Sequence, residues 1–246
     1  MTELLAIAES VWRRILKMKV LYFLVACAII EISISYSYRY LMANQHQMLM
    51  VDVSLLINMI AGVLCVLSLS FDIPKELKEG TVSTLLSKPL GRTQYIIGKY
   101  LGIMIVCVVV MSLITIGFGI VHYIAFDSFP LNAIKAHILT ILSMFPIAAI
   151  GLLFATFLTE TVAALLTTAA IFFFHSTHII GKIPVIYAGI IPDLNLFNLR
   201  AEATFRPGIS VSIDWSYLMM AGLWGLFYSI SIICITGLIF NRKDIK

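Results

Sequence analysis

The sequence predicts an all-α integral membrane protein with about six transmembrane helices, and three observations support this prediction. Of the 246 residues, 61% are hydrophobic and only 12% are charged, whereas soluble domains carry about 25% charged residues. The mean hydropathy is +1.01, and six segments have the roughly 20 apolar residues that a helix needs to cross a bilayer. These segments do not alternate polar and apolar residues, which excludes a barrel, and lipid excludes open sheets.

The six predicted spans differ in their charge. The first span contains one acidic residue, Glu31, and the other five contain no Asp, Glu, Lys or Arg. Only a tight turn at Thr159–Thr161 joins the fourth span to the fifth, so these two are expected to form an antiparallel hairpin. The predicted spans cover residues 20–38, 53–71, 100–126, 138–159, 161–181 and 215–240.

The distribution of Lys and Arg predicts the orientation of the chain. With the N-terminus in the cytoplasm, twelve of the 17 Lys and Arg residues lie inside and five lie outside, as the positive-inside rule requires. Six spans return the C-terminus to the cytoplasm. Both termini and the loop 72–99 are therefore expected on the cytoplasmic side.

Residues 1–19 predict an amphipathic helix ahead of the first span. Its apolar face includes Leu4, Ala8, Val11 and Trp12, and its basic residues lie mostly on the other face. A basic helix with Trp at its apolar edge is typical of the membrane interface. The alternative is a simple extension of the first span.

The chain is expected to form one domain over residues 1–246, with 20–71 as spans one and two, 100–181 as spans three to five and 215–246 as span six with a short tail. The outer loop 182–214 has 33 residues. It is too apolar for a solvated tether, so we expect short helices that dip back toward the membrane.

Several functions are disfavoured by what the chain contains. The net charge of +4 is spread over two termini and one loop, which suits anionic lipid headgroups and does not argue for nucleic acid. The four cysteines fall inside spans without metal-ligand spacing, and no catalytic set can be assembled. No phosphate-binding loop is present, so we expect no ATP hydrolysis, no catalytic residue and no metal site in this chain.

The loop 72–99 carries the strongest signal in the sequence. It is far longer than a connector between two spans requires, and it predicts a helix over 74–88 that stops before Pro89. Glu76 and Glu79 are spaced at i, i+3 and are expected on one side. An interfacial helix on anionic lipid is the simple alternative, but the negative surface potential of the membrane repels paired glutamates.

This loop resembles that of the permease subunits of type-two ABC transporters, in the branch that includes the permease acting in nitrous oxide reductase maturation. The shared pattern is E-x-x-x-G-T-x-x-x-L-L-S-K-P-x-x-R-x-x-x-x-x-G-K, which runs here from Glu76 to Lys99. The stretch "IIPDLNLFNLR" before the last span and the closing "IFNRKDIK" are also similar to that branch.

The resemblance implies that the loop contains a cytoplasmic coupling helix that docks on a separate ABC-type ATPase. ATP and Mg²⁺ would bind that partner, while this chain would bind no cofactor. A second permease copy, identical or a close paralogue, would complete a transporter in the plasma (inner) membrane, working as an exporter. The implied ATPase-coupling residues are Glu76, Glu79, Gly80, Thr81, Leu85, Pro89 and Arg92.

Two polar residues inside the spans are candidates for a substrate path. Glu31 is the one acid in an apolar run, and charges there are costly and often functional. It could instead lie near the outer interface among serines. Asn58 could bond to another helix or to a second permease. The alternative function is a membrane protein without transport, namely an intramembrane enzyme or an accessory or assembly factor.

Overall fold

The computed structural model is helical throughout the residues that it describes, which are 7–13, 19–37, 46–70, 72–82, 91–175, 192–199 and 213–242. No strand occurs in these ranges. Residues 7–13 form a helical segment that precedes the first long helix. The elements that follow are α2 (Lys19–Ser37), α3 (His46–Ser70), α4 (Asp72–Lys78), α6 (Arg92–Phe126), α7 (Leu131–Phe157), α8 (Glu160–His175), the 3-10 helix η2 (Leu194–Phe197) and α12 (Trp215–Asn241).

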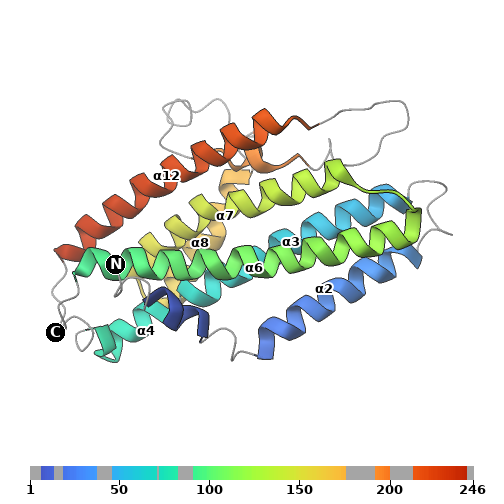
Figure 1. Cartoon of the computed structure of the whole chain (residues 1–246). Coiled ribbons are helices and arrows are strands. Elements are labelled where there is room, and N and C mark those ends of the chain that lie inside the picture. Colours follow the sequence, from blue (N-terminus) through green and yellow to red (C-terminus); the bar gives the residue numbers. More distant parts are fainter. Residues whose placement is uncertain are drawn as a thin grey trace.

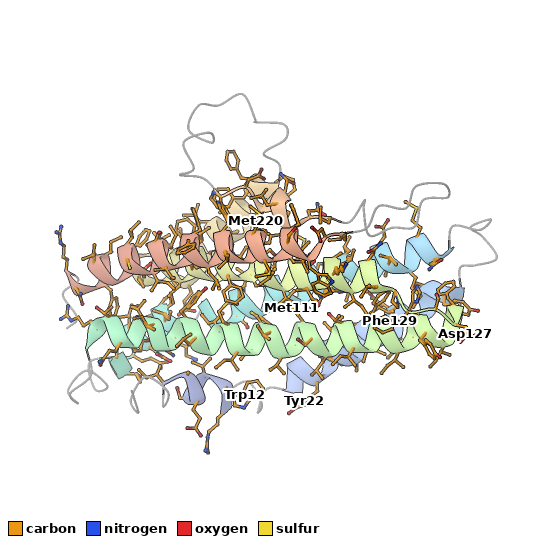
Figure 2. The ribbon with its side chains drawn as sticks, turned by 45° about the horizontal axis from the view of Figure 1, so that its top comes forward. Trp12, Tyr22, Met111, Asp127, Phe129 and Met220 are labelled. Atoms are coloured by element: carbon orange, nitrogen blue, oxygen red, sulfur yellow. The ribbon has the colours of Figure 1, made fainter. Side chains whose placement is uncertain are left out.

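The long helices lie side by side along one direction, while α4 lies at the end of the bundle where α6 begins and α12 ends (Figure 1). The central helix is α7, which packs against α3, α6, α8 and α12. Met111 is fully buried between helices, whereas Tyr22 and Met220 are 57% and 71% exposed and point away from the bundle (Figure 2). The apolar surface therefore faces both inward and outward, as in a bundle that lies in lipid.

Four helical stretches within the described residues are long and apolar enough to cross a membrane: Gln47–Lys78, Arg92–Phe126, Leu131–Phe157 and Trp215–Asn241. Two further apolar helices, α2 and α8, are shorter. The chain is therefore a helical multi-pass membrane protein, and the expected total of six spans remains a prediction.

Three helices begin well before the apolar runs that predicted them. The helix α3 begins at His46 instead of residue 53, α7 at Leu131 instead of residue 138, and α6 at Arg92 instead of residue 100. The added turns carry polar side chains that find partners inside the protein. Lys135, for example, is 6% exposed and donates to the carbonyl of Ile213 at 2.6 Å. A prediction from hydropathy alone excludes such polar residues from the helix.

The hairpin predicted between the fourth and fifth spans is present, since only Leu158 and Thr159 separate α7 from α8. Part of the long loop 182–214 also packs as its apolar composition suggested. In η2, Leu194 and Phe197 are buried, and the ring of Phe197 lies 6.1 Å from that of Trp224 on α12. Most of the remaining loop, 182–191 and 200–212, lies outside the described residues.

Candidate coupling surface

The short helix α4 presents one face to the protein and one to the outside. Ile73 is fully buried and Leu77 packs against the core. Lys75, Lys78 and Glu79 are exposed. The helix thus lies on the end of the bundle with a charged outer face.

Gly80 ends α4 and corrects the expectation of one helix over 74–88. Its φ of 71° lies in the left-handed region, and its N–H donates to the carbonyl of Leu77, as in a glycine-capped helix end. A second helical segment then begins at Thr81, which is exposed, and Val82, which is fully buried. Glycine adopts this backbone conformation without the steric cost that a Cβ brings.

Glu76 is buried within α4 and holds this helix to α6. Lys99 lies 2.6 Å from one carboxylate oxygen, and the Tyr95 hydroxyl donates to the other at 2.6 Å. Glu76 is 6% exposed, Lys99 is 4% exposed and Tyr95 is fully buried. Buried charges require such pairing, so these three side chains form one polar joint between two helices.

The expectation that Glu76 and Glu79 point from one side is wrong, because Glu76 is buried and Glu79 is exposed. Residues at i and i+3 lie about 60° apart around a helix of 3.6 residues per turn. The boundary of the surface that α4 buries against α6 lies between Glu76 and Glu79. The sequence spacing could not locate that boundary, because it depends on where Lys99 and Tyr95 lie.

Arg92 lies at the end of α12, where its guanidinium donates to the carbonyl of Asn241 at 3.0 Å. The side-chain amide of Asn241 donates in return to Thr93 at 3.3 Å. A cation is favourable at a helix C-terminus, whose carbonyls are unpaired. Arg92 therefore joins the start of α6 to the end of α12. Two other expected coupling residues, Leu85 and Pro89, lie outside the described residues.

The helical segment 7–13 packs against the start of α6 through two glycines. A Cβ on Gly98 would lie 2.9 Å from Ile7, and one on Gly102 would lie 2.7 Å from Val11. Both apolar side chains are buried. This part of the N-terminal helix therefore contacts protein, although the amphipathic pattern indicated lipid.

Asn58 lies in a buried polar cluster between α3, α6 and α7. Its amide nitrogen lies 3.0 Å from His137 Nδ1 and 3.5 Å from the Thr115 hydroxyl. Ser54 lies 3.2 Å from His137 Nε2 and gives its own proton to the carbonyl of Val51. A neutral His137 with its proton on Nε2 satisfies these contacts, because each ring nitrogen then meets a partner of the opposite kind.

The carbonyl oxygen of Asn58 is the one buried side-chain polar atom without a hydrogen-bond partner among the described residues. Glu31, the other candidate for a substrate path, is exposed on the outer surface of α2. The structure thus does not bring Glu31 and Asn58 together. One faces outward from the chain and the other lies inside it.

A cavity of about 110 Å³ lies between α3, α7, α8 and the η2 segment, with Met59, Thr140, Ser143 and His175 among its lining residues. Small-molecule sites usually enclose about 300–1,000 Å³, so this cavity is too small for a drug-sized ligand. No group of three or more metal-ligating side chains occurs in the described ranges.

Two functional candidates were missed in the sequence, Tyr95 and Lys99. Lys99 was identified only as part of the loop pattern. Its position directly before the apolar run 100–126 could also have indicated that its charge needs a partner. A lysine at the edge of an apolar helix needs a partner or a route to the surface, but the sequence does not say which acid would be that partner.

The comparison with known families gives one match. The family described as "ABC-2 family transporter protein" matches residues 13–198, which is more than half of the chain. The matched region includes all of α4 and the joint that Glu76, Tyr95 and Lys99 form. No curated protein matches the chain.

Proposed function

Because the chain belongs to the ABC-2 family of transporter proteins, we propose that it is the permease subunit of an ATP-driven exporter. A separate ABC-type ATPase binds and hydrolyses ATP with Mg²⁺, and this chain binds neither. The loop pattern from Glu76 to Lys99 further supports the branch that includes the permease of nitrous oxide reductase maturation.

The observation that carries this proposal is the construction of α4. A seven-residue helix is too short to be stable alone in water, yet a buried ion pair holds its inner face and leaves its outer face charged and exposed. Such a rigid, exposed element at the end of a membrane bundle is suited to receive a soluble partner. We assign this role of coupling helix to α4 and its continuation through residue 82.

The docking face that we propose consists of Glu79, Gly80 and Thr81, with Lys75 and Lys78 beside them. Leu85 and Pro89 extend it along the chain, as the family resemblance implies. Glu76 and Arg92 do not form part of this face in the proposal. They hold α4 and the start of α6 in position, because their described partners belong to this chain. The ATPase groove then meets both signs of charge, and an acidic rim would complement the two lysines.

The complete transporter in this proposal contains two permeases in the plasma membrane, with α4 on the cytoplasmic side. The excess of Lys and Arg at that side supports the orientation. A second copy also offers a partner for the exposed Glu31, since a carboxylate facing hydrocarbon is costly. Asn58 contacts cargo only if α3 and α6 separate and expose its unpaired oxygen.

The first experiment is to isolate the full chain from its native membranes in a mild detergent and to identify the co-purifying proteins by mass spectrometry. A stoichiometric soluble protein with a phosphate-binding loop is expected. Recovery of the chain alone, under conditions that preserve other ABC complexes, would contradict the proposal. It would favour the accessory-factor alternative, with α4 on the lipid surface.

A further inference from the structure

We propose that α4 and the inner end of α12 move as one body when the ATPase acts, and that Tyr95, Lys99 and Phe240 are the positioning residues that join them. This inference rests on the proposed function. It adds the path by which a displacement of α4 reaches Phe240 on α12, which is more than 150 residues after Glu76 in the sequence.

The first link is the polar joint between α4 and α6. Glu76 accepts from Lys99 and from Tyr95, both at 2.6 Å, with all three side chains nearly or fully buried. Charge-assisted bonds of this length are about twice as strong as neutral ones. Water cannot replace either partner in a buried site, so α4 cannot shift along α6 without breaking the joint.

The second link is an aromatic contact between α6 and α12. The Tyr95 ring stacks on Phe240 with centroids 5.8 Å apart and an angle of 16° between the planes. Phe240 is fully buried. Tyr95 therefore contacts Glu76 with its hydroxyl and Phe240 with its ring, and one rigid side chain bridges α4 and α12.

The third link lies one turn before Tyr95 on α6. Arg92 donates to the carbonyl of Asn241 at the end of α12, and the side-chain amide of Asn241 donates to Thr93. A Cβ on Gly237 would lie 3.4 Å from the Thr93 side chain, an ordinary van der Waals contact, so α6 and α12 are packed together here. The start of α6 is thus bound to α4 on one side and to α12 on the other.

The consequence is mechanical. The helix α12 runs from the end of the bundle near α4 along much of its length (Figure 1), about 40 Å for 27 residues at 1.5 Å each. A helix that is packed in a core moves as one rigid unit, because a packed core switches between discrete arrangements and does not deform continuously. A tilt that enters at Phe240 therefore changes the position of the outer end of α12 near Met219.

The test uses the full chain in complex with its co-purified ATPase, reconstituted in nanodiscs. The four native cysteines are replaced by alanine, and spin labels are placed at Ile34 on α2 and Met219 on α12, both exposed. The labelled chain is diluted in unlabelled chain so that only distances within one chain are measured. The distance between the labels is compared without nucleotide and with ATP and vanadate.

We expect a nucleotide-dependent shift in this distance, reduced by Tyr95→Phe and by Phe240→Leu. The first variant removes the hydroxyl and keeps the ring, and the second removes the aromatic contact and keeps the ion pair. Because both variants act on the same bridge through Tyr95, the double variant is expected to reduce the shift by less than the sum of the two single reductions. Tyr228→Leu is the matched control, since Tyr228 stacks on Trp224 with centroids 5.5 Å apart and the same 16° angle, away from α4.

The outcomes separate the inference from the proposed function. The inference is overturned if the ATPase remains bound and hydrolyses ATP but the distance between the labels does not change. It is also overturned if the two variants leave the shift unchanged, or if their reductions of the shift add fully in the double variant. In each case the permease assignment stands. If no ATPase co-purifies with the parent chain, the proposed function fails, and the inference fails with it.

Discussion

The ammonium group of Lys99 lies 2.6 Å from the carboxylate of Glu76, and the two side chains are only 5% and 8% exposed. These residues are 23 positions apart, on α6 and α4, and their contact decides which face of α4 the protein buries. An ion pair in this environment loses hydration from both partners. Its presence therefore indicates a need for fixed geometry at this point more than a gain in stability.

Breaking the pair from one side should destabilise the protein. Lys99→Met leaves the Glu76 carboxylate buried without its cation, and removal of one partner of a buried pair costs about 3–5 kcal/mol. The double variant Glu76→Gln with Lys99→Met should recover most of this loss, since glutamine still accepts from Tyr95. Thermal unfolding of the purified chain in detergent measures both. Equal stability of Lys99→Met and the parent chain would show that the pair is absent in the membrane.

Reversal of charge at Glu79 should weaken the contact with the ATPase and leave the fold unchanged. Glu79 is exposed, so Glu79→Lys disturbs no interior contact that the structure describes. Charge reversal at an interface rim mainly slows association and makes it more sensitive to salt. Glu9→Lys is the control, because Glu9 is also exposed and, within the described residues, forms its ion pair with Arg13 at i, i+4. Co-purification of the ATPase at low and high salt gives the readout, and equal recovery with both variants would exclude Glu79 from the docking face.

Gly80→Ala should destabilise the turn that ends α4. The left-handed conformation at φ 71° costs an alanine about 1–2 kcal/mol. Asparagine tolerates this conformation better, so Gly80→Asn should cost less. Gly119→Ala is the control, since a Cβ there meets nothing within 4 Å and alanine is favoured inside helices. A more stable Gly80→Ala variant would mean that the turn adopts a different conformation.

Gly102→Ala should displace the N-terminal helical segment from α6. The new Cβ would lie 2.7 Å from the Cβ of Val11, and overpacking of this kind costs about 1–3 kcal/mol. Val11→Gly in the same chain should restore the fit, because alanine would keep the clashing Cβ, although Val11→Gly alone removes buried apolar surface and lowers helix propensity. Unfolding temperatures of the two single variants and the double variant give the coupling. Strictly additive losses would place segment 7–13 away from Gly102.

Much of the architecture was predictable because bilayer crossing imposes a strong rule on sequence. The predicted segment 20–38 corresponds to α2, and 215–240 corresponds to α12, each within one residue. The rule fails where polar side chains are satisfied inside the protein, so the early turns of α3 and α7 were predicted as loop. Lys135 and its contact with Ile213 illustrate this failure.

The candidate site was predictable in its location and not in its geometry. The charged loop 72–99 marked the region, and the exposed Glu79 and Thr81 lie in it as the docking proposal requires. Glu76 was assigned to the same exposed face, because local spacing reports only neighbours on one helix. The contact that buries Glu76 comes from Tyr95 and Lys99, which lie on another helix.

By itself, the amino-acid sequence determined that the chain is a helical membrane protein and that its charged loop is the feature to explain, since both follow from composition and local order. Only the tertiary structure decided that Glu76 is an internal anchor, that Arg92 binds the end of α12, and that Glu31 and Asn58 lie apart. These are contacts between helices distant in sequence. They depend on the rotation and depth at which helices pack, which no local pattern specifies.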